Sequence, residues 1–252
     1  MSGLVTLLGA GPGDAELLTL KGKRRLQEAD VLVFDRLVNQ ELFQHLKSDC
    51  EKIDVGKKPG QPCIRQEEIE KILIEKARQG KRVVRLKSGD PYIFGRGGEE
   101  GVKLVEAGVD FEVVPGITSA VAGLTYAGIP MTYRDVATSF HVFTAHLKDE
   151  TEMLNWEAIS KLKGTLVFLM GMKNLPTIVQ ELTARGYGKD KPAAIVEWGT
   201  HPQQRSVDGT LGNIVELAEA EDFKAPSVIV VGDVVAYRQQ LNFHENLPLF
   251  GR

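Results

Sequence analysis

The sequence predicts an α/β protein built from two α/β domains, and three observations support this fold class. The chain has 252 residues, which exceeds the usual size of a single domain. Short apolar runs alternate with segments of helical length, as in a parallel sheet covered by helices. A second series of such runs begins near Ser139. Hydrophobic residues make up 42% and charged residues 26% of the chain, which is typical of a folded globular protein.

Apolar runs of the first half are expected to form strands. They are residues 5–8, 31–34, 83–86 and 111–114. Residues 66–79 carry apolar side chains at helical spacing, and Gly80 follows as a common helix stop. We therefore predict a helix over residues 66–79.

The second half repeats this pattern with one difference. Its expected strands are residues 140–144, 166–170, 194–198 and 228–231, and its expected helices are residues 175–184 and 211–220. The run 204–207 follows the strand ending at Trp198 too closely for a crossover connection. It is expected to pair antiparallel with a neighbour, which makes the second sheet mixed.

The segment between the two series predicts a domain boundary. Residues 126–138 include Gly128, Pro130 and several polar side chains. We place the N-terminal domain at residues 1–130 and the C-terminal domain at residues 131–252. A cleft between two such domains is a usual place for a ligand, so the active site is expected there.

Composition argues against several functional classes. The net charge of −3 gives no basic footprint for nucleic acid. The most apolar stretch, residues 113–130, contains glycines, hydroxyl side chains and prolines, and it makes a poor membrane span. The two cysteines and five histidines show no metal-ligand spacing. No export signal precedes Leu4, so a cytoplasmic location is expected.

The first glycine-rich loop, Gly9 to Asp14, allows two interpretations. It follows an expected strand, and Asp35 ends the next strand about twenty residues later, as in a dinucleotide-binding fold. However, Asp14 stands where the third glycine of that fingerprint belongs, and Pro12 lacks an N–H for phosphate. Both features disfavour a nicotinamide or flavin cofactor. S-adenosylmethionine is a cation without phosphate, so neither feature disfavours it.

Two further loops follow expected strands. Residues 87–100 combine four glycines, a proline and several charges, and residues 114–119 lead into the next expected helix. A long turn and a simple helix cap by Thr118 or Ser119 are the alternative interpretations. Since the carboxyl ends of parallel strands share one edge of a sheet, we expect all three loops to converge on one ligand site.

Six sequence elements together resemble the tetrapyrrole methylases, and they occur in family order over essentially the whole chain. They are residues 9–14, 35–37, 55–58, 89–100, 115–118 and 144–148. The GDPxxFGRGGEE run is most similar to family members that methylate uroporphyrinogen III. The resemblance implies two unequal α/β domains, S-adenosylmethionine as cofactor, a tetrapyrrole substrate and a homodimer.

The resemblance also implies roles for individual residues. The cofactor-binding positions would be Pro12, Ser88, Gly89, Asp90, Ile93, Thr118, Ser119, Met170 and Gly199. The substrate-binding positions would be Arg96, Glu99 and Arg134, and an arginine offers a planar bidentate match to a substrate carboxylate. The catalytic candidates are Asp35, Lys57 and Glu99.

The implied reaction is methylation of pyrrole carbons C2 and C7, which gives precorrin-2 for sirohaem or cobalamin biosynthesis and releases S-adenosylhomocysteine. No metal is required, but a base must remove a proton from the macrocycle. Asp35 and Glu99 are candidate bases, with Lys57 as a donor or electrostatic partner, and the sequence does not rank them. The alternatives are a precorrin methyltransferase acting on a later corrin intermediate, a dinucleotide-binding oxidoreductase and a sensor that binds S-adenosylmethionine without turnover.

Overall fold

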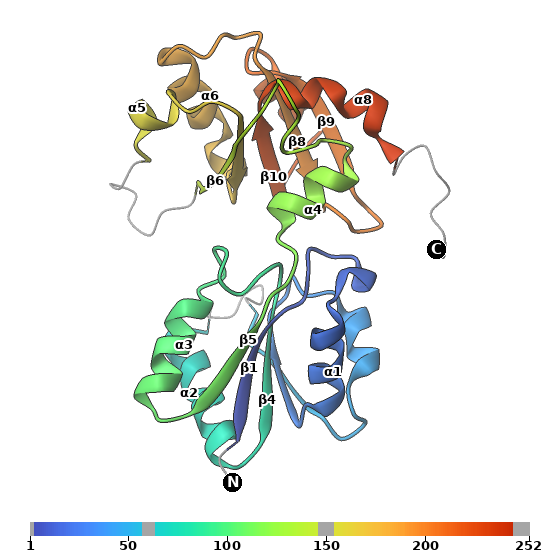
Figure 1. The fold of residues 1–252 in the computed structure, drawn as a ribbon, viewed down its shortest axis with the longest axis vertical. Coiled ribbons are helices and arrows are strands. Elements are labelled where there is room, and N and C mark those ends of the chain that lie inside the picture. Colours follow the sequence, from blue (N-terminus) through green and yellow to red (C-terminus); the bar gives the residue numbers. More distant parts are fainter. Residues whose placement is uncertain (1–2, 57–63, 146–153, 244–252) are drawn as a thin grey trace. The chain divides into compact units, whose positions relative to one another are not determined.

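The computed structural model describes residues 3–56, 64–145 and 154–243. The chain divides into two compact units, Met1–Thr118 and Ser119–Arg252. Each unit contains one five-stranded sheet with helices on both faces (Figure 1). Helix α4 (Ser119–Tyr126) falls within the predicted N-terminal domain of residues 1–130, and it packs on the second sheet through Ala120 and Leu124.

The first sheet is entirely parallel. Its strands are β1 (Leu4–Gly9), β2 (Val31–Phe34), β3 (Glu51–Asp54), β4 (Arg82–Lys87) and β5 (Asp110–Val114), in the order β3-β2-β4-β1-β5. The prediction of four of these strands is confirmed. Strand β3 was missed because it lies at the sheet edge and Ile53 is its only apolar residue.

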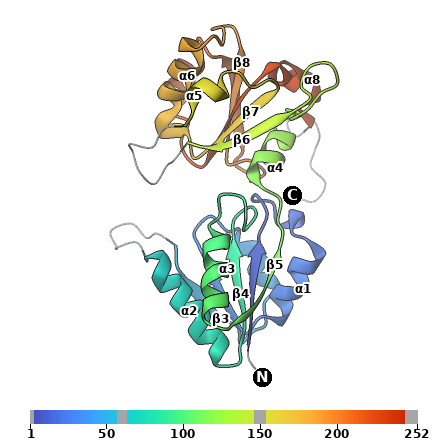
Figure 2. The same ribbon diagram turned by 60° about the vertical axis from the view of Figure 1, so that its left-hand side comes forward.

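Helices of the first unit cover the sheet on both sides, as Figure 2 shows from a second angle. They are α1 (Leu20–Glu28), α2 (Gln66–Arg78) and α3 (Gly97–Glu106), with short 3-10 helices η1 (Ala15–Leu17) and η2 (Gln40–His45). Successive side chains of a strand point to opposite faces. Thus Leu8 and Leu86 pack with Leu26 of α1, while Leu7 and Val83 pack on the side of α2 and α3. The predicted helix over residues 66–79 is confirmed as α2.

The second sheet is mixed, as predicted. Its strands are β6 (Phe140–Thr144), β7 (Thr165–Leu169), β8 (Pro192–Glu197), β9 (Arg205–Thr210) and β10 (Ser227–Val231), in the order β6-β7-β10-β8-β9. Strands β6 and β7 are parallel, and β10 is antiparallel to both of its neighbours. The predicted antiparallel pairing of the run at 204–207 is confirmed, because β9 pairs with β8 in that direction.

Two helical layers cover the second sheet. Its remaining helices are α5 (Trp156–Ile159), α6 (Leu175–Ala184), α7 (Ile214–Ala220) and α8 (Arg238–Leu241), with 3-10 helices η3 (Met172–Asn174) and η4 (Asp233–Tyr237). The helices α5, α6 and α7 pack on one face around Phe168, and α4 with η4 pack on the other around Val230. In the described parts of the chain, no helix has the length and apolar character needed to cross a bilayer.

A cluster of charges fastens α1 to the first sheet. Glu112 on β5 accepts hydrogen bonds from Thr6 Oγ1 at 3.1 Å and from Arg25, and Lys21 Nζ lies 2.8 Å from its other carboxylate oxygen. The bond from Arg25 contributes most to lowering the pKa of Glu112, to about 2. The cluster is thus a source of pH-dependent stability.

We expect Glu112 to contribute to acid lability. Because its pKa is lower in the folded state than the ordinary value of 4.5, its contribution is complete above about pH 4.5 and is lost as the pH falls toward 2. The contribution is at most about 3 kcal/mol and is smaller in practice, since the side chain is partly exposed. Urea unfolding between pH 6 and pH 2 should show a flatter stability curve for Glu112→Gln. The exposed control Glu106→Gln should keep the wild-type curve, and equal slopes for Glu112→Gln and wild type would contradict the assignment.

Candidate functional site

Three glycine-rich loops meet at the carboxyl edge of the first sheet. They follow β1, β4 and β5, which are neighbours in the sheet. Gly11 and Gly89 exchange two backbone hydrogen bonds, with N···O distances of 2.7 and 3.2 Å. The predicted convergence of the three loops is therefore confirmed within this unit.

The loops touch through their backbones, and glycine is what permits this. A Cβ atom placed on Gly116 would lie 2.2 Å from the carbonyl oxygen of Gly89. A Cβ atom on Gly9 would lie 2.5 Å from the backbone nitrogen of Gly116. Any side chain at Gly9 or Gly116 would thus force the loops apart.

Asp90 joins two of these loops. Its Oδ1 accepts a hydrogen bond from the N–H of Tyr92 at 2.8 Å, and its Oδ2 accepts one from the N–H of Gly116 at 3.1 Å. Both contacts are to backbone groups, so the carboxylate fixes loop geometry. Close by in the sequence, Ile93 projects an apolar side chain that is 42% exposed.

The remaining predicted cofactor residues of the first unit lie on the same three loops. Pro12 is a buried residue of the first loop, Ser88 and Gly89 begin the second, and Thr118 ends the third. A Cβ atom placed on Gly89 would lie 3.7 Å from the Cα atom of Thr118. The structure therefore brings these predicted residues of the first unit together.

The predicted cofactor residues of the second unit lie on two of its strand ends and on α4. Met170 follows β7 and Gly199 follows β8, and these two strands run in the same direction because β10 is antiparallel to both. Ser119 is the first residue of α4. A Cβ atom on Gly199 would lie 2.8 Å from the Cα atom of Gly123, so β8 and α4 are in close contact there. Arg134 lies elsewhere in this unit, in an exposed turn.

Backbone strain gathers in the same loops. Seven non-glycine residues of the described chain have a positive φ angle, and five of them lie in loops that carry predicted cofactor-binding residues. These five are Phe94, Arg96, Met170, Trp198 and Thr200. Such conformations cost free energy and are found most often at functional sites. The strain therefore supports a functional role for the loops of each unit.

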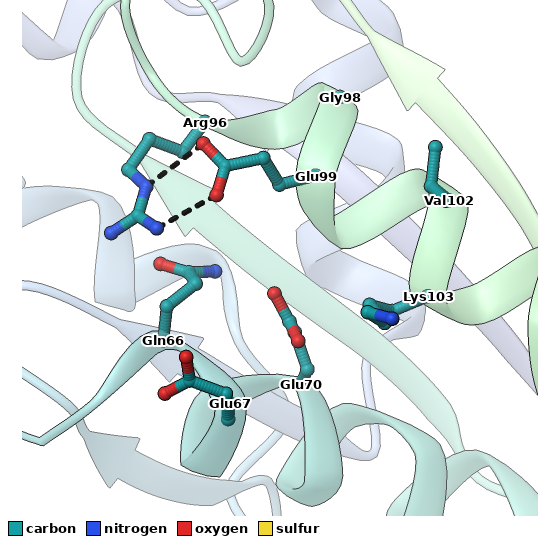
Figure 3. Close-up of a pocket in the computed structure, with 8 residues that line it drawn as sticks. All are labelled: Gln66, Glu67, Glu70, Arg96, Gly98, Glu99, Val102 and Lys103. Atoms are coloured by element: carbon teal, nitrogen blue, oxygen red, sulfur yellow. Dashed lines mark hydrogen bonds and ion pairs between the residues drawn. The ribbon is translucent and has the colours of Figure 1, made fainter.

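Arg96 and Glu99 lie beside a pocket of about 450 Å³ between α2 and α3 (Figure 3). The guanidinium of Arg96 makes two bonds to the Glu99 carboxylate, at 3.0 and 2.7 Å. Both side chains are more than half exposed, so this pair contributes at most about 1 kcal/mol. A carboxylate of a ligand could therefore replace Glu99 on Arg96 at little cost.

A buried ionic network next to Asp35 was not predicted from the sequence. Arg85 Nη2 lies 3.1 Å from Asp35 Oδ2, and Arg85 Nε lies 3.1 Å from Glu100 Oε1. Lys87 Nζ lies 3.0 Å from the same Glu100 oxygen. Burial is the main cause that lowers the pKa of Lys87, and the nearby Arg85 lowers it further.

A signal for this network is present in the sequence. Arg85 and Lys87 alternate in β4, the central strand of the sheet, where both faces are covered. Two cations on one buried face require a buried anion, and Glu100 supplies it from α3.

Lys57, the third catalytic candidate, lies outside the described residues. Within the described ranges, no group of three or more His, Cys, Asp or Glu side chains is arranged to hold a metal ion.

The strand order bears on the dinucleotide alternative. In the classic dinucleotide-binding sheet the first two strands are neighbours. Here β4 lies between β1 and β2, and the carboxylate of Asp35 is paired with Arg85. Asp35 is therefore not placed as a ribose ligand beside the first glycine loop.

Known proteins resemble the chain over most of its length. The siroheme synthase of Escherichia coli is 50% identical over 244 residues, which are 97% of this chain and 53% of that protein. The chain thus spans about half the length of the curated relatives it matches. A uroporphyrin-III C-methyl transferase from Thermus thermophilus, solved in complex with S-adenyl homocysteine, has a TM-score of 0.79 and 38% identity, covering 92% of this chain and 93% of that one.

A second solved structure, a cobalt precorrin-4 methyltransferase, has a TM-score of 0.82 and 28% identity, covering 92% of this chain and 95% of that one. The family model described as Tetrapyrrole (Corrin/Porphyrin) Methylases matches residues 4–215. This match includes all three glycine loops and the strained residues that follow β7 and β8. The chain therefore belongs to the tetrapyrrole methylases.

Proposed function

We propose that this protein transfers methyl groups from S-adenosylmethionine to carbons C2 and C7 of uroporphyrinogen III, giving precorrin-2. The observation that carries the proposal is the junction of three glycine loops at one sheet edge, in a chain similar to a methyl transferase solved with S-adenyl homocysteine. Precorrin-2 fits a role in the biosynthesis of sirohaem or cobalamin.

The charges of the loops fit this cofactor. Asp14 and Asp90 place two carboxyl groups on the first and second loops, which suits a sulfonium cation and opposes a pyrophosphate. The glycine contacts let the three loops approach one another closely at the carboxyl ends of their strands. We assign Pro12, Ser88, Gly89, Asp90, Ile93, Thr118, Ser119, Met170 and Gly199 to cofactor binding. When bound, S-adenosylmethionine supplies an activated methyl group, so no metal is needed for the transfer.

Arg96, Glu99 and Arg134 are the proposed substrate-binding residues. Uroporphyrinogen carries eight carboxylic acids, and the exposed Arg96 presents a planar fork that fits one carboxylate. In the free protein Glu99 occupies that fork. A substrate carboxylate would displace Glu99 from Arg96.

Methylation of a pyrrole carbon leaves a cation that must lose a proton. Asp35 is the favoured acceptor, because its carboxylate is one-third exposed and lies at the carboxyl ends of the parallel strands, where the glycine loops also begin. Glu99 is the second candidate, and Lys57 is proposed as a donor or electrostatic partner. Proton transfer by a positioned group typically contributes about 10² to 10⁴-fold to a rate.

The oligomeric state and the cellular location of the protein are also proposed. We propose a homodimer, which the family resemblance implies, and a cytoplasmic location. Size-exclusion chromatography with light scattering would test the first, and cell fractionation would test the second.

The decisive experiment counts methyl groups. Purified protein is incubated anaerobically with uroporphyrinogen III and methyl-labelled S-adenosylmethionine, and the macrocycle is analysed by mass spectrometry. Two added methyl groups are expected, because both C2 and C7 are proposed to react. A single methyl group or none would contradict the proposed reaction.

A second candidate is methylation of a later corrin intermediate. It is favoured by the similarity to the cobalt precorrin-4 methyltransferase structure. In this case S-adenosylmethionine binds, uroporphyrinogen III remains unmodified and a corrin substrate gains one methyl group. The same mass-spectrometric assay with the two substrates in parallel separates the candidates.

A further inference from the structure

The buried network beside Asp35 suggests a role that the proposed function does not include. We infer that Arg85 is a positioning residue that fixes the Asp35 carboxylate for proton transfer, and that Glu100 and Lys87 hold Arg85 in place. This inference rests on the proposed methyl transfer and on Asp35 as its proton acceptor.

The guanidinium of Arg85 has little freedom to move. Its Nε is bonded to Glu100 at 3.1 Å, its Nη1 to the carbonyl oxygen of Leu86 at 3.4 Å and its Nη2 to Asp35 at 3.1 Å. Only 4% of the side chain is exposed. A rigid donor at this distance fixes the orientation of the Asp35 carboxylate. Without such a donor, the side chain of Asp35, at the start of a loop, could adopt several orientations.

Glu100 is the anchor of the network. Its side chain is fully buried, and its Oε1 accepts bonds from Arg85, from Lys87 at 3.0 Å and from Gln66 at 3.2 Å. Its Oε2 is buried and has no hydrogen-bond partner among the residues that the structure describes. Leaving a buried carboxylate oxygen unpaired is costly, which indicates that Glu100 is oriented for Arg85 and Lys87 at the expense of its own second oxygen.

The ion pairs of the network form one continuous chain. Glu100 pairs with Arg85 and Lys87, and Arg85 pairs in turn with Asp35. A displacement of Glu100 is therefore transmitted to Asp35 through Arg85.

Fold stability alone does not explain the network. Buried ionic groups can often be replaced by apolar side chains of similar volume without loss of stability. A chain that needed only a packed interface between β4 and α3 could use such side chains. The ionic groups instead end at the one partly exposed carboxylate of the network, Asp35.

A double-mutant cycle on the full-length protein tests the inference. Arg85→Met, Asp35→Asn and the double variant are compared with wild type for kcat and KM in methyl transfer to uroporphyrinogen III. We expect Arg85→Met to lower kcat by about tenfold or more, with little change in either KM, since only proton transfer is affected. The double variant should be no slower than Asp35→Asn alone, because the two residues act as one unit.

Two further variants separate positioning from folding. Arg85→Lys keeps the charge without the rigid fork and should recover only part of the lost kcat. Arg25→Met removes a different partly buried arginine, the partner of Glu112, and should leave kcat within about twofold of wild type. Binding of S-adenosylhomocysteine, measured by calorimetry, reports whether each variant is folded. Should Arg85→Met fail to bind, the cycle is run with Arg85→Lys.

The outcomes distinguish the inference from the proposed function. The positioning role would be overturned if the decrease in kcat of the double variant equalled the product of the two single decreases. An unchanged kcat in Arg85→Met would also overturn it. An unchanged kcat in Asp35→Asn would also overturn it, while methyl transfer by the wild type would still support the proposed function. Absence of methyl transfer by the wild type would overturn both.

Discussion

Replacing Gly116 by alanine is expected to destabilise the first unit by about 3 kcal/mol and to weaken cofactor binding strongly. The added Cβ atom would lie 2.2 Å from the carbonyl oxygen of Gly89 and 2.8 Å from the Cα atom of Gly9. All of these neighbours are backbone atoms, so no side-chain rotation relieves the contact. The loops after β1, β4 and β5 must then separate, and the bond from Gly116 to Asp90 is lengthened or lost.

Urea unfolding and calorimetric titration with S-adenosylhomocysteine would measure the two effects of Gly116→Ala. The matched control is Gly98→Ala in α3, where an added Cβ atom has no neighbour within 4 Å. This control should be neutral or slightly stabilising, since alanine is the better helix former. Wild-type stability and affinity in Gly116→Ala would show that the loop junction can open without consequence.

Replacing Glu100 by glutamine should be still more disruptive. It leaves the buried cations Arg85 and Lys87 with only Asp35 as an anionic partner, and the loss of one member of a buried ionic group typically costs about 3–5 kcal/mol. This is a large part of the stability of a typical domain. A shift of the urea midpoint to lower concentration, with an unchanged slope, is the expected result.

A triple variant provides the comparison for Glu100→Gln. Arg85→Met, Lys87→Met and Glu100→Leu together remove all the buried charges of the network and retain most of the side-chain volume. Stability should return close to wild type, because no charge remains buried without a partner. If Glu100→Gln were as stable as wild type, the buried cations would not depend on Glu100.

Much of the fold could be predicted because apolar patterning is local. Strands of both sheets and helices such as α2 and α6 are visible as runs or as helical spacing. Strand β3 could not be predicted in this way, since an exposed edge strand needs little apolar surface. The strand orders could not be predicted either, because they depend on pairings between distant segments such as β1 with β4.

The candidate site was only partly predictable. The glycine loops carry enough unusual residues to indicate a ligand, and the order of parallel strands brings them together. The network of Arg85, Lys87 and Glu100 was not predicted from the sequence. Burial of Arg85 and Lys87 follows from the central position of β4 in the sheet, and the sequence alone does not show that position.

The position of β1 between β4 and β5 also has a consequence during synthesis. Leu4 pairs with Arg82 on one side and with Asp110 on the other, so the first strand made is among the last to be paired. At about 5–20 residues per second, a ribosome needs on the order of ten seconds to reach β4 after making β1. Throughout that interval an apolar strand has both of its hydrogen-bonding edges open. Folding of the first unit is thus tied to the end of its own translation, and early contact with a chaperone would protect this segment.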